Sequence, residues 1–455
     1  MLQTIRPAWA MLLPAFLCLS TAAVAHDDDR GGNADPKVVA VRQRFFGAEN
    51  VNPVTAGVDK DAVIFSWVTN STVAVSLRGR IFLLDSYIQR LELPPAAGQP
   101  DLRRTPLDYQ DLVTLRPEAI FLGHGHGDHA DNAAYVAKWL NIPIYTSPET
   151  CDVMQADVRR MFADPNSANG GTRIIPDGNP VNCVPVVSRA SQPGAEIVNL
   201  DQFEPLACIV AFKHIHSGTV PTDQPFVPVN NISDPREPDL YPPGPCVTPT
   251  NTCSGNGTPT TPTAGQVNLT TTGFGTIPGS PGGSISLFYQ FVLRDDRNFA
   301  FVWHNTTGPL KEGTGSDPGL PSPAIGAKLF SIMESLPQTD IEFGSIVSAG
   351  WATNGVRDPV LYHQHIRPKI YVPLHQTNVA AISSSLEFKK SLLLTQQARN
   401  VGWKPELRWM VDPDDYLRPM VYDPKDKRWE TPGKSARVEQ FCGKLGHHKG
   451  DRDGD

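Results

Sequence analysis

A dense cluster of potential metal ligands most constrains what this chain can fold into. The stretch FLGHGHGDHADN, residues 121–132, follows an apolar run typical of a buried strand and overlaps residues 130–141, whose apolar spacing is that of a helix. A glycine-rich loop between a strand and a helix can turn its side chains toward neighbouring points. Imidazole and carboxylate groups are ligands that zinc and related transition metals prefer. The candidate ligands in this stretch are His124, His126, Asp128 and His129.

The N-terminus predicts a secretion signal. MLQTIRPAW carries one basic residue and no acidic one, an apolar run follows it, and small residues stand at 23–25, where a signal peptidase would cleave. We expect residues 1–25 to be removed and residues 26–36 to form a flexible tail. The mature protein would then be secreted or periplasmic, without a stable membrane anchor.

The cysteine content agrees with an oxidising compartment. Seven cysteines occur, and Cys18 lies in the signal segment, which leaves six. An even number in an exported protein indicates disulfide bonds, although the pairing does not follow from the number. Cys246 and Cys253 enclose a short loop rich in turn residues, so we expect this pair to close most easily.

The rest of the chain predicts one large domain over residues 37–404, followed by a C-terminal extension over 405–455. Strand-like runs gather between 60 and 90 and return after 284, with helical patterns between and after them. This order predicts layered α/β packing, in which helices cover the outer faces of sheets. Residues 219–283 are rich in Pro, Thr and Gly and have no periodicity, which indicates a surface insertion.

The charge distribution argues against a nucleic-acid partner. The formal net charge of −7 comes from 40 basic and 47 acidic residues, and the basic ones form no stripe. We therefore expect no nucleic-acid partner. The oligomeric state does not follow from the sequence.

The motif H-x-H-x-D-H at 124–129 resembles the hallmark of the metallo-β-lactamase fold superfamily. STVAVSLRGRIFLLDS resembles the early hairpin of the family, which ends in an aspartate, here Asp85. RPKIYVPLHQTN resembles the last-ligand segment of the branch that contains ascorbate-6-phosphate lactonase-like proteins and N-acyl-phosphatidylethanolamine phospholipase D. The resemblance covers roughly residues 60–400. It implies an αββα four-layer sandwich with metals at one edge of both sheets, here with a long Pro/Thr/Gly-rich insertion.

The resemblance also implies ligands for a first metal. His124 and His126 match two of them. The third falls at His214 or His216 in IVAFKHIHSG, and strand alternation does not separate these two because both lie on one face. We favour His216, since HSG fits the pattern of the branch better and follows the apolar run of the strand.

For a second metal, Asp128 and His129 match the ligands in the first motif, and His375 matches the last ligand. The family usually adds an aspartate that bridges both metals, but FVWHNTTG at 301–308 contains none. Asn305 aligns better with that slot by the threonine that follows, whereas His304 is the better ligand. A neutral side chain cannot bridge two cations as a carboxylate does, so the site is expected to hold one or two metals.

These features predict a zinc-dependent hydrolase, with another transition metal as an alternative to zinc. A metal-activated water would cleave an ester, lactone, amide or phosphodiester bond. The resemblance to the branch named above implies a small-molecule substrate that carries an acyl or phosphate group. Asp128 would orient or deprotonate the water, and His304, if not a ligand, would stabilise the developing oxyanion. The alternatives are a β-lactamase, a secreted non-catalytic metal-binding protein that retains the fold, and a flavin-partnered di-iron redox enzyme.

Overall fold

The computed structural model describes most of the predicted domain. The predicted signal segment, all of the insertion at 219–283 with its Cys246–Cys253 pair, and most of the helix expected at 378–400 lie outside the described residues. The described residues are 33–88, 107, 109–163, 175–216, 285–294, 297–313, 322–346, 357–375, 388–390, 392–393, 396–397, 402–410, 415 and 417–444.

The first sheet has seven strands in the order β14-β1-β2-β3-β4-β5-β6. The predicted meander forms β1 to β3, paired antiparallel, and β3, β4, β5 and β6 then run parallel. Val, Ile and Phe fill these strands because branched and aromatic side chains pack well on a pleated surface. The strands are β1 (Val63–Thr69), β2 (Thr72–Leu77), β3 (Arg80–Leu84), β4 (Ile120–Phe121), β5 (Ile144–Thr146), β6 (Cys183–Pro185) and β14 (Met420–Tyr422).

The second sheet also has seven strands, in the order β13-β12-β11-β10-β9-β8-β7. Its strands β7 to β10 are antiparallel, whereas β10 to β13 are parallel. The strands are β7 (Ile197–Leu200), β8 (Ala207–His214), β9 (Ser286–Leu293), β10 (Ala300–His304), β11 (Ile341–Ser345), β12 (Ile370–Leu374) and β13 (Glu406–Leu407).

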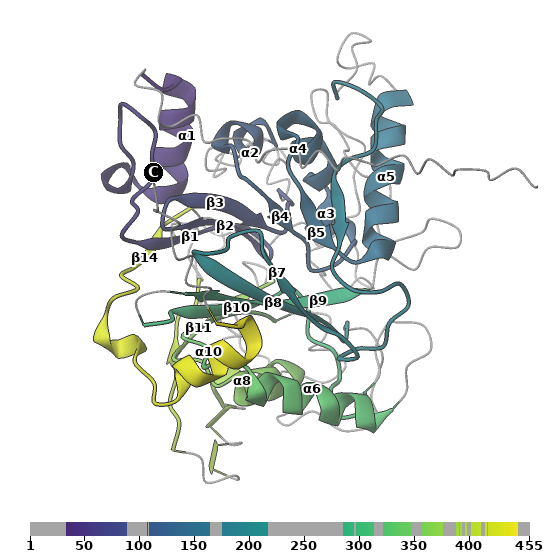
Figure 1. Ribbon diagram of the computed structural model, residues 1–455, viewed down its shortest axis with the longest axis vertical. Helices are drawn as coiled ribbons and strands as arrows, with labels where there is room; N and C mark the ends of the chain where they lie inside the picture. Colours follow the sequence, from purple (N-terminus) through teal and green to yellow (C-terminus); the bar gives the residue numbers. More distant parts are fainter. Residues whose placement is uncertain are drawn as a thin grey trace, which may run out of the picture.

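The two sheets face each other between two layers of helices (Figure 1). A core rich in aromatic residues, with Phe65, Phe121 and Phe301 among its members, fills the space between the sheets. Separate apolar clusters lie under the helices on each outer face. The four-layer αββα sandwich expected from the sequence is therefore confirmed. The first helical layer contains α1 (Pro36–Phe46), α2 (Tyr109–Leu115), α4 (Ala133–Leu140) and α5 (Pro148–Ala163), and the second contains α6 (Pro323–Ser335), α8 (Arg357–Ile366) and α10 (Lys434–Cys442).

The C-terminal residues take part in both sheets, because β13 pairs with β12 and β14 pairs with β1. A short helix, η2 (Ala48–Asn50), follows α1, and η6 (Lys427–Trp429) precedes α10. Two disulfides lie in the described part of the chain: Cys151–Cys183 joins α5 to β6, and Cys208–Cys442 joins β8 to the end of α10. None of the described helices combines the length and apolar character that a membrane span requires.

Candidate metal centre

The candidate site lies where strands from both sheets end. Asp85, His124, His216, Asn305 and His375 each follow the carboxyl end of a strand, namely β3, β4, β8, β10 and β12. Parallel strands end at the same edge of a sheet, so these loops gather at one place. A four-residue helix, α3 (Gly127–Ala130), follows the loop after β4 and carries two further candidates.

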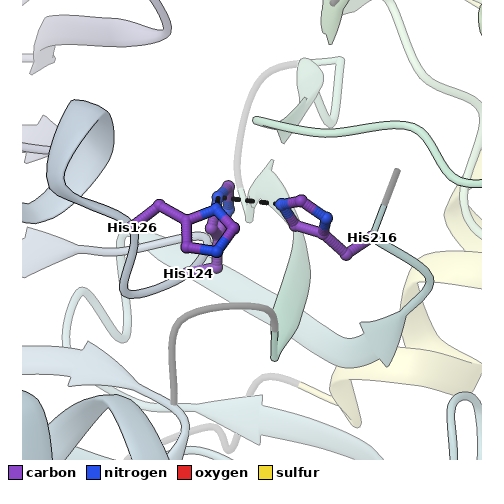
Figure 2. Close-up of side chains that lie close together, drawn as sticks. All are labelled: His124, His126 and His216. Carbon is purple, nitrogen blue, oxygen red and sulfur yellow. Dashed lines mark hydrogen bonds between the residues drawn. The ribbon is translucent and has the colours of Figure 1, made fainter. Parts of the chain in front are cut away.

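The first group of potential ligands consists of His124, His126 and His216. His124 Nε2 lies 3.1 Å from His126 Nδ1 and 3.2 Å from His216 Nε2. His216 approaches from the opposite side to the other two, and the three rings point toward one another (Figure 2). Three imidazole nitrogens therefore meet at one point.

Two imidazoles of the first group, those of His124 and His126, are held in their neutral form. Burial, with the charges of the neighbouring histidines, places the pKa of His124 well below its ordinary value. Burial also lowers the pKa of His126 to about 3. A neutral imidazole has a free ring nitrogen to offer, so these two histidines do not have to lose protons before they bind a cation.

The second group consists of Asp128, His129 and His375. His375 Nε2 lies 3.1 Å from both Asp128 Oδ2 and His129 Nε2. Burial alone would raise the pKa of Asp128, but the charge of His129 and the hydrogen bond from His375 outweigh it and lower that pKa. The ring centroids of His124 and His129 are 4.1 Å apart, so the two groups adjoin.

Asp85 and Ser71 hold His129 from behind. His129 Nδ1 lies 2.7 Å from Asp85 Oδ2 and 2.8 Å from Ser71 Oγ, and all three residues are buried. Burial would lower the pKa of His129, but the charges of Asp128 and Asp85 raise it above its ordinary value. A carboxylate behind a histidine fixes its ring and directs its other nitrogen, here Nε2, toward the site.

Asn70, in the turn between β1 and β2, supports the second group. Its Nδ2 donates to the Asp128 backbone oxygen at 2.8 Å and to Asp128 Oδ2 at 3.3 Å. Its backbone oxygen accepts from the His375 N–H at 3.1 Å. The sequence analysis did not identify Asn70, because an asparagine between two apolar strands is also what an ordinary turn requires.

Asn305 lies behind both groups and does not face between them. Its side chain contacts His124 and Asp85 and is fully buried. A Cβ on Gly123 would come within 2.2 Å of the Asn305 amide carbon, so only glycine leaves room for this contact. Among the described residues, no carboxylate joins the two groups in the way that the family's bridging aspartate would.

The structure does not bring His214 or His304 into either group. His214 is the last residue of β8 and lies on its outer face, where its Nδ1 is 3.0 Å from Tyr362 Oη. The chain leaves the sheet directly after it, and this frees His216 to turn toward His124. His304 Nε2 lies 3.0 Å from Glu342 Oε1, in a buried pair on the second sheet.

The donor set fits a transition metal. Ring nitrogens that share one tetrahedral zinc ion lie roughly 3.3 Å apart, given zinc–nitrogen distances of about 2.0–2.1 Å. The distances of 3.1 and 3.2 Å in the first group are close to this value. Two imidazoles with one carboxylate form the second group, a set that suits zinc and iron.

The four layers, the strand order and the position of the histidine motif after β4 define the metallo-β-lactamase fold. The fold that the sequence resemblance implied is thus confirmed. No protein-family profile and no curated protein sequence matches the chain.

Solved structures with a similar arrangement include two hydrolases and a hydroxylase. A metallo hydrolase from Ignicoccus hospitalis is 12% identical, with 79% of this chain and 98% of that chain covered and a TM-score of 0.38. An isothiocyanate hydrolase from Delia radicum gut bacteria is 14% identical, with 79% and 99% covered and a TM-score of 0.37. The diiron β-hydroxylase CmlA from Streptomyces venezuelae is 12% identical, with 80% and 54% covered and a TM-score of 0.34.

Proposed function

We propose that this protein is a metal-dependent hydrolase and that each of the two adjoining groups holds a metal ion. The convergence of three imidazole nitrogens in the first group, two of them on histidines with lowered pKa values, is the observation that carries the proposal. A protein interior rarely leaves several imidazole nitrogens facing one another without a shared cation or proton. The proposed ligands are His124, His126 and His216 in the first group and Asp128, His129 and His375 in the second.

Part of the site is accessible from outside. His124 and His129 are buried, whereas the side chains of Asp128 and His375 retain 15% and 12% of their exposure. The buried residues form the floor of the site, and the partly exposed ones face the side from which a substrate arrives. A bound metal ion would lower the pKa of a water molecule and polarise the substrate oxygen.

Asp128 is the proposed positioning group for the attacking water. Its lowered pKa keeps it a carboxylate, which is a hydrogen-bond acceptor at all physiological pH values. Asn70 and His375 hold this carboxylate from two sides. The sequence suggested that His304 stabilises the developing oxyanion. We do not propose this role for His304, because its Nε2 contacts Glu342 within the second sheet.

The proposed reaction is hydrolysis of an ester, lactone, amide or phosphodiester bond in an acyl- or phosphate-bearing small molecule. Zinc is the proposed metal, since three imidazoles suit it. The second group also suits iron, so elemental analysis has to report both metals. Export is part of the proposal, because two disulfides in one domain fit an oxidising compartment.

Hydrolysis of a chromogenic panel tests the function. We expect the mature protein to cleave at least one aryl ester, lactone, phosphodiester or β-lactam, to lose the activity with a chelator and to regain it with Zn²⁺. Asp128→Asn should lower kcat by at least about 100-fold, the scale of a lost acid–base or water-orienting group. Asp131→Asn, the same change at the end of α3 and outside both groups, is the matched control. Metal-independent turnover, or equal rates in both variants, would contradict the proposal.

A further inference from the structure

We propose that Asn305 is a positioning residue that orients both groups at once, and that a carboxylate cannot take its place. The inference rests on the metal-binding part of the proposed function. It is specific to this chain, because the family resemblance would lead one to expect that an aspartate at this position completes the site.

The surroundings of Asn305 fix which way its amide points. Its Nδ2 lies 3.1 Å from Asp85 Oδ1 and 2.9 Å from Asp85 Oδ2. A carboxylate can only accept hydrogen bonds, so the amide nitrogen has to face Asp85. The amide oxygen then faces His124 Nδ1, at 2.9 Å.

This orientation selects a tautomer at His124. An amide oxygen only accepts, so His124 Nδ1 carries the hydrogen and donates it to Asn305. The lone pair is therefore on Nε2, the atom that faces His126 and His216. Partners of this kind set the tautomer and ring orientation of a metal-ligating histidine.

The same amide steadies the carboxylate behind the second group. Asp85 accepts from Asn305, from Ser71 Oγ at 2.9 Å and from the Gly123 N–H at 3.1 Å. So held, its Oδ2 accepts from His129 Nδ1 at 2.7 Å, which directs His129 Nε2 to the site. A single buried side chain thus links one histidine of each group.

A carboxylate at position 305 would disrupt this arrangement. It would lie about where the amide nitrogen lies now, 2.9 and 3.1 Å from the two oxygens of Asp85. Both positions are fully buried, and two buried carboxylates in contact repel each other. The side chain at 305 also packs closely against Gly123, where an added Cβ would come within 2.2 Å of it.

The test measures metal binding by the full mature chain. Zn²⁺ affinity is obtained by competition with a chromophoric chelator, and absorption spectra are recorded at saturating Co²⁺. We expect Asn305→Ala to weaken Zn²⁺ binding about 10- to 100-fold, the usual cost of losing such a partner. Asn305→Asp should weaken it at least as much, and both should change the Co²⁺ spectrum. Asn298→Asp, the same change at an asparagine before β10 that bonds Ser435, is the control and should bind as the wild type does.

The outcomes separate this inference from the proposed function. A wild-type chain that binds neither ion defeats the proposed function itself. If the wild type binds metal, then wild-type affinity or an additional metal ion in Asn305→Asp overturns the inference, because the new carboxylate would be acting as a ligand. If Asn305→Asp does not fold, Asn305→Ala decides: weaker binding with a changed spectrum supports the inference, and wild-type affinity or a wild-type spectrum overturns it.

Discussion

The histidines of the two groups differ in the direction in which their pKa values are shifted. Burial lowers the pKa of His124 and His126, so these two members of the first group are neutral and ready for a cation. The pKa of His129 is raised despite its burial, because Asp128 and Asp85 flank it. A metal ion has to displace that proton before it binds the second group. Metal binding to the second group therefore competes with protonation of His129, whereas His124 and His126 have no such proton to lose.

This difference predicts that the metals leave in a fixed order as the pH falls. Below the raised pKa of His129, the affinity of the second group should fall by about tenfold per pH unit. Dialysis at about pH 8 and about pH 5.5, around the ordinary range of histidine, followed by elemental mass spectrometry should show the loss of one metal per chain. His375→Ala, which lacks the second group, should keep its metal at both pH values. Loss of both metals together would contradict the assignment.

The sequence predicts the potential metal ligands better than it predicts the residues that form hydrogen bonds with them. All six side chains that the structure gathers were candidates, because each one is of a ligand-forming type in a recognisable segment. The choice between His214 and His216 depended on where β8 ends, and periodicity does not give the last residue of a strand. The contacts of Asn70 and Asn305 depend on tertiary packing, which leaves no local signal.

At the scale of elements, β10, β11 and α8 are joined by a buried polar cluster that lies outside the metal groups. Glu342 on β11 has its two carboxylate oxygens at 3.0 Å from His304 Nε2 and 2.8 Å from His363 Nδ1. All three residues are fully or almost fully buried. Burial would raise the pKa of Glu342, but the two histidines outweigh it and lower that pKa. The cluster then stabilises the fold above the unfolded-state pKa of glutamate, and the effect is lost only as the pH falls through the lowered pKa.

Glu342→Gln should therefore destabilise the protein without emptying the metal site. The substitution removes a buried charge from its partners, and we expect a loss of about 2–4 kcal/mol in the free energy of unfolding. Urea unfolding monitored by circular dichroism measures the loss, and elemental mass spectrometry checks that the metal content is unchanged.

Glu334 offers a matched control on α6. It makes a similar contact with His365, 2.7 Å from oxygen to nitrogen, but its side chain is 48% exposed. Exposed pairs contribute little, so Glu334→Gln should change stability by less than about 1 kcal/mol. Equal effects of the two substitutions, or loss of metal in Glu342→Gln, would show that burial does not set the strength of this cluster.

At the scale of the whole molecule, the site depends on both sheets. The loop and helix after β4 in the first sheet supply four of the six proposed ligands, and β8 and β12 of the second sheet lead to the other two. The aromatic core between the sheets packs them against each other. The layered fold was predictable from alternating strand and helix patterns. The strands β13 and β14 were not, because each has only two or three residues in a segment rich in proline and charge.

Metal content per chain is the measurement that tests the central claim most directly. Elemental mass spectrometry of the purified mature protein at neutral pH should find about two metal ions per chain in the wild type. It should find about one in His216→Ala and in His375→Ala, since each variant loses one group, and about two in Asp131→Asn. A wild-type chain without stoichiometric metal, or ligand variants that keep the wild-type content, would contradict the account.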